Sequence, residues 1–171
     1  MKKQGFTLIE LMVVIVIMGI LAAVAVPKLF GMIAKSKASE IGPAAGTYVK
    51  LQDAYISESG TGIGDWKLIG YKMASTSNFK YYEGTTEGGL TAGTSVLLSA
   101  GKQAGWKAKN NGALNDCQAN GVWRIDVDAN TGSGGAATYH TSTSSADCNT
   151  LTPSFEKLNT STTAHATTGA T

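Results

Sequence analysis

A long apolar run close to the N-terminus is the feature that most constrains this chain. Leu11–Val26 contains no charged side chain, and Pro27 follows. Counted from Phe6, the run has 21 residues, and at about 1.5 Å per residue a helix of that length is roughly 31 Å long. A bilayer hydrocarbon core is about 30 Å thick, so the run predicts a membrane-spanning helix. Lys2 and Lys3 on the short flank predict a cytoplasmic N-terminus and a C-terminal part across the membrane.

One acidic residue, Glu10, interrupts this apolar segment. A charge at the centre of a membrane helix costs about 3 kcal/mol, less toward the end, and such residues usually have a functional partner. No basic residue lies one helical turn from Glu10, and Lys3 is seven positions back. Within one molecule, Glu10 therefore has no obvious helical partner for its charge.

The N-terminal segment resembles the signature of type IV prepilins. After a short basic leader, residues 5–10 read Gly-Phe-Thr-Leu-Ile-Glu, and a charge-free run then ends at Pro27. This resemblance implies that prepilin peptidase cuts between Gly5 and Phe6 and N-methylates Phe6. It also implies that the Phe6 amine of one subunit meets Glu10 of a neighbour in a helical filament.

Physical chemistry agrees with that implied pair. A buried cation and a buried carboxylate each cost free energy alone, and pairing offsets much of that cost. The pair forms only between subunits staggered along the helix axis, so it would set their register. Pro27 predicts a kink, because it lacks an N–H donor and crowds the preceding turn. By the same resemblance, the stretch from Gly19 to Pro27 is expected to lose helical regularity in the filament.

Two other interpretations of the segment compete with this one. An ordinary secretory signal peptide would be cleaved near Ala23-Val24-Ala25, but Glu10 interrupts its apolar region and that region is long. A plain single-span anchor would let Glu10 reach the membrane interface. A lipoprotein of the usual form is excluded, because no Cys follows the run.

Beyond the membrane the helix is expected to continue as an amphipathic segment. Residues at spacings near three and four would face a globular domain; they are Ile41, Ala44, Ala45, Tyr48, Leu51 and Tyr55. Gly42-Pro43 is expected to bend or interrupt the helix, and the glycines at positions 60, 62 and 64 to end it.

After Gly64 the apolar period changes to two, which predicts strands. Trp123, Ile125 and Val127 alternate with polar residues and form the clearest one. The other expected elements are strands at Asn78–Tyr82, Thr94–Ser99 and Ala136–Thr141 and a turn at Asn130–Gly132. The predicted fold class is α+β, in which the long N-terminal helix packs on a C-terminal antiparallel β-sheet, as in the pilin fold.

The expected organisation has five parts: a leader at 1–5, a transmembrane and assembly helix at 6–27, its amphipathic continuation at 28–60, an antiparallel β domain at 61–157, and a mobile Thr- and Ala-rich tail at 158–171. The tail is expected to be mobile because of its low-complexity composition.

Two cysteines, Cys117 and Cys148, lie in the part predicted to be outside the cytoplasm. A disulfide is the expected state there, and two free thiols are the alternative. The bond would close a loop of about 30 residues around the last hairpin, which the chain-entropy model values at roughly 3–4 kcal/mol. Many pilins have a similar C-terminal disulfide loop.

No catalytic site, cofactor or metal site is predicted. Asp126–Gly132 resembles a calcium loop, but its Gly is seventh and no Glu follows before Glu156, so a strand end with a turn is favoured. His140 and His165 are isolated. Trp66, Trp106 and Trp123 are expected to pack in a core or on a sheet rather than bind sugars.

Net charge gives no general case for nucleic acid. Removing residues 1–5 takes two lysines from the 14 basic residues and leaves 12, equal to the 12 acidic ones. A near-neutral chain has no long-range attraction for a polyanion, although a local patch is not visible in a sequence.

The leading functional hypothesis is the structural subunit, or major pilin, of a type IV pilus. Its expected partners are other copies of the chain, the inner membrane before assembly, prepilin peptidase and the pilus assembly machinery. The expected locations are the inner membrane and then an extracellular filament. A type II secretion pseudopilin or a minor pilin is the alternative, and a simply anchored surface binding protein is a third.

Overall fold

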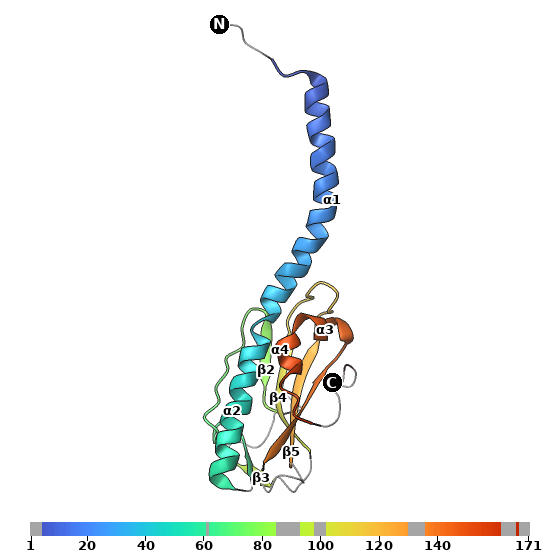
Figure 1. Cartoon of the computed structure of the whole chain (residues 1–171). Helices are drawn as coiled ribbons and strands as arrows, with labels where there is room; N and C mark the ends of the chain where they lie inside the picture. The colour runs from blue at the N-terminus through green and yellow to red at the C-terminus, as the bar shows by residue number, and fades with distance from the viewer. Residues whose placement is uncertain are drawn as a thin grey trace.

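The computed structural model describes residues 5–60, 62–84, 93–97, 102–129, 136–161 and 167. It consists of a long helical stalk and a head built around a sheet (Figure 1). Helix α1 runs through Leu8–Ala38 and helix α2 through Ile41–Ser59. The leader's Lys2 and Lys3, the predicted turn at Asn130–Gly132 and the tail's His165 lie outside the described residues.

The stalk forms where the sequence predicted a helix, with one difference in where it breaks. Pro27 lies inside α1, which continues through it, and the axis of α1 changes direction partway along (Figure 1). The break comes at Ser39 and Glu40, which form a turn, rather than at Gly42-Pro43. Proline is tolerated in the first turn of a helix, where its missing N–H leaves no bond unmade, so Pro43 fits into the start of α2. Gly60 ends α2 with a positive φ of 76°, as glycine readily does.

The head contains one four-stranded and one two-stranded antiparallel sheet. The larger sheet has the order β2-β4-β5-β6, and the smaller pairs β1 with β3. The strands are β1 Gly62–Gly64, β2 Phe79–Tyr82, β3 Ser95–Leu97, β4 Gln103–Asn110, β5 Val122–Ala129 and β6 Ala137–Thr143. Two short helices follow, α3 at Ala146–Leu151 and α4 at Pro153–Glu156. The α+β prediction is therefore confirmed, but the bounds of β1 and β4 had not been predicted.

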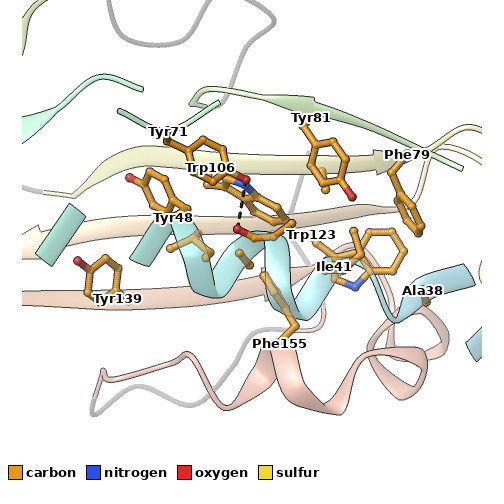
Figure 2. Packing of buried hydrophobic residues seen from close by; sticks show 14 of the residues in the cluster. Ala38, Ile41, Tyr48, Tyr71, Phe79, Tyr81, Trp106, Trp123, Tyr139 and Phe155 are labelled. Atoms are coloured by element: carbon orange, nitrogen blue, oxygen red, sulfur yellow. Dashed lines mark hydrogen bonds between the residues drawn. The ribbon is translucent and has the colours of Figure 1, made fainter. Parts of the chain in front are cut away.

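The core lies between α2 and the larger sheet and is rich in aromatic residues (Figure 2). Trp106 and Trp123 are fully buried, and each indole N–H has an acceptor: the Tyr71 hydroxyl at 2.9 Å and the Thr152 hydroxyl at 2.8 Å. Phe155 of α4 packs beside Trp106, with 5.9 Å between ring centroids. The third tryptophan, Trp66, packs against the same core. The prediction that the three tryptophans pack in a core or on a sheet is confirmed.

The buried face of α2 is close to the predicted one. Ile41, Ala44, Ala45 and Tyr48 are buried, whereas Leu51 and Tyr55 are only partly buried. The C-terminal half of the face is completed by two other residues, Gln52 and Ile56. With its amide oriented to satisfy both groups, Gln52 donates to the Gly64 carbonyl at 3.1 Å and accepts from the Gly64 N–H at 2.9 Å. A buried glutamine is stable here because its amide is paired.

The start of the C-terminal tail is held against the edge strand β6. The Thr160 N–H donates to the Tyr139 carbonyl at 3.0 Å, and the Tyr139 N–H donates to the Thr160 hydroxyl at 2.8 Å. Asn159 accepts from the Thr141 N–H through its side-chain oxygen at 3.4 Å. The first tail residues, which composition had grouped with a mobile segment, therefore cover part of a sheet edge.

Candidate functional site

The N-terminal three quarters of α1, from Leu8 to Phe30, is an apolar surface that the fold leaves uncovered. Every residue from Gly5 to Phe30 is exposed, and Ala34 is the first buried residue among those that the structure describes. Phe6, just before the helix, is 86% exposed. Within the described part of the chain, only the helical stretch Leu8–Ser59 is long and apolar enough to cross a membrane. An apolar surface of this size marks a membrane or protein contact.

The start of α1 is fixed by a reciprocal cap between Thr7 and Glu10. The Thr7 hydroxyl accepts from the Glu10 N–H at 3.4 Å, and the Glu10 carboxylate accepts from the Thr7 N–H at 2.8 Å. The Thr7 hydroxyl also donates to the same carboxylate oxygen, Oε2, at 2.6 Å. This is a capping box, which satisfies backbone N–H groups that the first helical turn leaves without partners.

Glu10 therefore has a partner within its own chain that reasoning from charge alone missed. The search had been for a basic residue one turn away, whereas the observed partner is a neutral hydroxyl and a backbone N–H three residues earlier. The signal was present in the sequence: Thr-x-x-Glu directly before an apolar run is the capping-box pattern.

The cap leaves part of the carboxylate available. Both bonds to the carboxylate go to Oε2, and no described residue donates to Oε1. An ionised carboxylate has about four acceptor positions on its two oxygens. Glu10 can therefore hold the helix start and accept a further donor from outside the chain at the same time.

The other predicted site residues fall into two separate regions. Gly5 and Phe6 precede α1, and Gly19 has open space where a Cβ would lie. Cys117 and Cys148 form a disulfide in the head, with 4.7 Å between their Cα atoms. The disulfide therefore lies in a different part of the molecule from Phe6 and Glu10. Of the predicted site residues, Glu10 makes its contacts with Thr7 at the start of α1.

The disulfide and the core beside it are tightly packed. A Cβ on Gly121 would lie 2.8 Å from the Cys148 sulfur and 2.9 Å from the Cys117 sulfur. A Cβ on Gly105 would lie 1.9 Å from the Tyr48 hydroxyl. Burial raises the pKa of Tyr48, and it raises the pKa of Tyr71 to about 12. The head is therefore tightly packed at these two glycines, and Tyr48 and Tyr71 stay neutral at physiological pH.

No group of three or more His, Cys, Asp or Glu side chains able to hold a metal ion occurs among the described residues. Asp126 instead lies within β5, where it accepts from the Arg124 side chain at 2.6 Å. Asp126 therefore lies in a strand, as the sequence favoured over a calcium loop.

Comparisons with known proteins bear directly on this N-terminal region. The family model described as the prokaryotic N-terminal methylation motif matches residues 1–26. The chain is 39% identical over 98 residues to the fimbrial protein EcpC of Eikenella corrodens, covering 57% of this chain and 61% of that protein. It is 35% identical over 119 residues to the type IV major fimbrial protein FimA of Dichelobacter nodosus, covering 67% of this chain and 66% of that protein.

A third relative shares a shorter region. The type IV major pilin protein PilA of Myxococcus xanthus is 44% identical over 57 residues, or 33% of this chain and 26% of that protein. The matches thus span less than two thirds of each of these relatives. No solved structure matches the chain. The N-terminal methylation motif and these similar fimbrial and pilin proteins confirm the predicted resemblance to type IV pilins.

Proposed function

We propose that this protein is the major structural subunit of a type IV pilus. The observation that carries the proposal is the uncovered apolar length of α1, from Leu8 to Phe30, directly after a matched N-terminal methylation motif. Burying apolar surface releases roughly 25 cal/mol per Å², so an exposed helix of this length is unstable in water. A membrane and then a bundle of identical helices would each cover it.

The proposal includes processing between Gly5 and Phe6. Such a cut leaves the complete Thr7–Glu10 capping box within the mature chain, one residue from the new amine. The mature chain would then begin with a methylated, protonatable amine on Phe6. The Oε1 atom of a neighbour's Glu10 is a suitable acceptor for it, because the cap occupies only Oε2.

The proposed topology places the N-terminus in the cytoplasm and the head outside it before assembly. The disulfide between Cys117 and Cys148 supports this side for the head, because disulfides persist outside the reducing cytoplasm. Prepilin peptidase and the pilus assembly machinery are the partners that this route requires. Assembly would draw α1 from the bilayer into the filament core.

Two of the relatives favour a major pilin over a pseudopilin or minor pilin. They are named a type IV major fimbrial protein and a type IV major pilin protein. The simply anchored binding protein has no comparable support, and it gives no reason for a carboxylate oxygen left available within the membrane segment.

Electron microscopy of sheared surface material, with mass spectrometry of the subunit's N-terminus, tests the proposal. The expected result is filaments built of this chain, beginning at N-methyl-Phe6. A mature chain beginning at Val26 would establish the secretory-signal alternative instead. Absence of the chain from all surface filaments, with the uncut protein retained in the membrane, would support the simple anchor.

A further inference from the structure

Three lysines lie around α1 directly after the length that can span a membrane. Lys28, Lys35 and Lys37 are all exposed and are here called the lysine collar. At about 1.5 Å per residue, the collar covers roughly 14 Å of the helix axis. Each residue turns the helix by about 100°, so Lys28 and Lys35, seven positions apart, lie on one side and Lys37 lies on the opposite side. The collar therefore places positive charge on both sides of the stalk.

No acidic side chain balances the lysine collar. Residues 11–39 contain neither Asp nor Glu. Among the residues that the structure describes, none of the three collar lysines forms an ion pair. The next acidic residue, Glu40, accepts instead from two hydroxyl groups of the head. The collar thus combines unpaired positive charge with the apolar surface of α1 beside it.

A groove between stalk and head has an apolar lining and one collar lysine. Phe30 and Ile33 of α1 line it together with Leu114 of the head, and Lys37 also contributes. Its volume is about 220 Å³. Asp116, close to Leu114 in the chain, lines a different hollow beside the disulfide. Because Phe30 also belongs to the uncovered surface of α1, the groove continues that surface to the head.

A second hollow, on α1 alone, has the same chemistry. It has a volume of about 470 Å³, and Lys28 lines it with apolar neighbours that include Val26 and Met32. It lies beside Pro27, where the charge-free run ends. Apolar surface next to a single cation suits a ligand that has both an apolar chain and an anionic group. This combination occurs twice around the collar, once with Lys28 and once with Lys37.

The height of the collar along α1 fits the headgroup layer of a bilayer. Counted from Phe6, a hydrocarbon core about 30 Å thick ends near Val26, and the headgroup layer adds roughly 5–7 Å on each side. Lys28 lies at the inner boundary of that layer. Side chains of a helix lean toward its N-terminus, so Lys35 and Lys37 lean back toward the membrane. A tilt of about 20°, average for a membrane helix, brings them closer still.

We propose that the lysine collar binds anionic phospholipids, with a lysine on the phosphate of a lipid and the acyl chains along the apolar surface beside it. The proposal deepens the membrane stage of the proposed function and rests on it. Basic residues beside a membrane helix are attracted to anionic lipids. A protein partner docks on one face of a helix, whereas lipids surround it. The lysines on both sides of α1 therefore favour lipids as the ligand.

The collar would matter most after processing. Removal of residues 1–5 takes away Lys2 and Lys3, which are the lysines on the other flank of the span. The collar then holds the remaining lysines beside the span. Anionic lipids bound there would help to retain α1 in the bilayer, and assembly of a filament would require their release.

The test measures lipid binding to the full-length protein in nonionic detergent by native mass spectrometry. The probes are phosphatidylglycerol, which is anionic, and phosphatidylcholine with the same acyl chains, whose headgroup is neutral overall. Glycerol phosphate, which carries the charge without acyl chains, is added as a competitor. Tryptophan fluorescence verifies folding of the head.

Two triple variants are compared with the wild type. The collar variant carries Lys28→Gln, Lys35→Gln and Lys37→Gln. The control makes the same charge change at three exposed lysines of α2 and the head, with Lys50→Gln, Lys67→Gln and Lys72→Gln. Any binding to the leader contributes equally, because all three proteins share the same sequence there.

The expected result is a loss of about fivefold in the affinity of the collar variant for phosphatidylglycerol, with the control unchanged. Fivefold is equivalent to about 1 kcal/mol, the attraction of one lysine to an anionic lipid surface. The affinity for phosphatidylcholine should be similar in all three proteins. A higher concentration of ammonium acetate should reduce the difference between the two lipids, because salt screens the charge of the collar.

Equal binding of the two lipids by the wild type, or equal losses in both variants, would overturn the proposal. Complete displacement of phosphatidylglycerol by glycerol phosphate would also overturn it, because the site would then take a phosphate group without the lipid. The assay uses detergent-dispersed protein and needs no filament. Collar-dependent lipid binding by a chain that is absent from all surface filaments would refute the pilus proposal and support this one.

Discussion

The two helices α1 and α2 are consecutive in the chain yet have opposite environments. From Leu8 to Phe30, α1 buries nothing, whereas α2 buries a full face, including Ile41, Tyr48 and Ile56. The difference follows from the pattern of side chains: α1 is apolar on all sides, and α2 is apolar on one side. We therefore expect the head to keep its fold independently of the exposed part of α1, whereas that part of α1 needs lipid or other copies of the chain to cover it.

The strongest test of this difference between α1 and α2 separates the two roles of Glu10, which are to cap the helix and to supply a charge for a neighbouring subunit. Glu10→Val removes both the charge and the cap, whereas Glu10→Gln keeps a cap acceptor and removes only the charge. Because the neighbour's Phe6 amine would lose its counter-charge in both, we expect normal amounts of processed membrane protein and few or no filaments. Glu10→Asp, which keeps the charge on a shorter arm, should give an intermediate number. Cell fractionation and filament counting measure both quantities.

Thr7→Ala is the matched control for the cap. It removes the capping hydroxyl at a cost of about 1 kcal/mol and leaves the Glu10 charge in place. Filaments should therefore still form. Abundant filaments from Glu10→Gln together with their loss in Thr7→Ala would show that Glu10 acts in assembly through the cap and not through its charge.

The next largest expected effect concerns the head alone. Replacing both disulfide cysteines (Cys117→Ser with Cys148→Ser) removes a cross-link between residues 31 apart, which should lower the head's free energy of unfolding by about 3–4 kcal/mol. All three tryptophans lie in the head, so tryptophan fluorescence during denaturant unfolding follows the head without α1. An unchanged transition midpoint, or free thiols in peptides mapped without reductant, would contradict the disulfide's role.

Gly105→Ala tests how tightly the head is packed. Its Cβ would lie 1.9 Å from the Tyr48 hydroxyl, so the core must shift, at a cost of about 1–3 kcal/mol. Gly112→Ala is the control, because its Cβ would have open space around it. Tryptophan-detected unfolding should show a lower midpoint for the first variant only. Equal midpoints would mean that the interior yields more easily than its packing indicates.

The smallest effect is the dependence of the head's stability on alkaline pH. Burial raises the pKa of Tyr71 to about 12, whereas the unfolded chain titrates near 10. The unfolded state thus loses its proton first, and stability that is complete below about pH 10 is lost as the pH rises toward 12. Every tyrosine lies beyond α1, so tryptophan fluorescence should report unfolding while far-ultraviolet circular dichroism retains the signal of α1. Simultaneous loss of both signals would contradict the independence of the two regions.

The sequence predicted those elements whose structure follows from a single property, such as apolar length or the alternation of apolar and polar residues. The apolar length of the N-terminal run determines α1, and the alternation at Trp123, Ile125 and Val127 marks β5, whose inward residues are fully buried. It gave no bounds for β4, because Gln103–Asn110 is rich in Ala, Gly and Lys, which have low strand propensity. Pairing with β2 on one side and β5 on the other compensates for that propensity. The sequence contains no direct sign of those partners.

The sequence identified the residues of the candidate site, but it did not reveal all of the contacts that they make. Glu10 was singled out for its cost in an apolar environment, but its bonds to Thr7 depend on local helix geometry that charge counting ignores. The sequence also gives no sign that Lys80, Lys107 and Arg124 lie on neighbouring strands, because they are far apart in the chain. Only the strand register places them on neighbouring positions.

The turn between α1 and α2 determines how a mechanical load would enter the head. Glu40 begins α2 without a side-chain bond to that helix. Its carboxylate instead accepts from the Thr76 hydroxyl at 2.7 Å and from the Tyr81 hydroxyl of β2 at 3.3 Å. Tension applied along α1 is therefore shared between the backbone of α2 and the edge of the sheet. We therefore expect the strength of the joint between stalk and head to depend on these two hydrogen bonds as well as on the peptide chain.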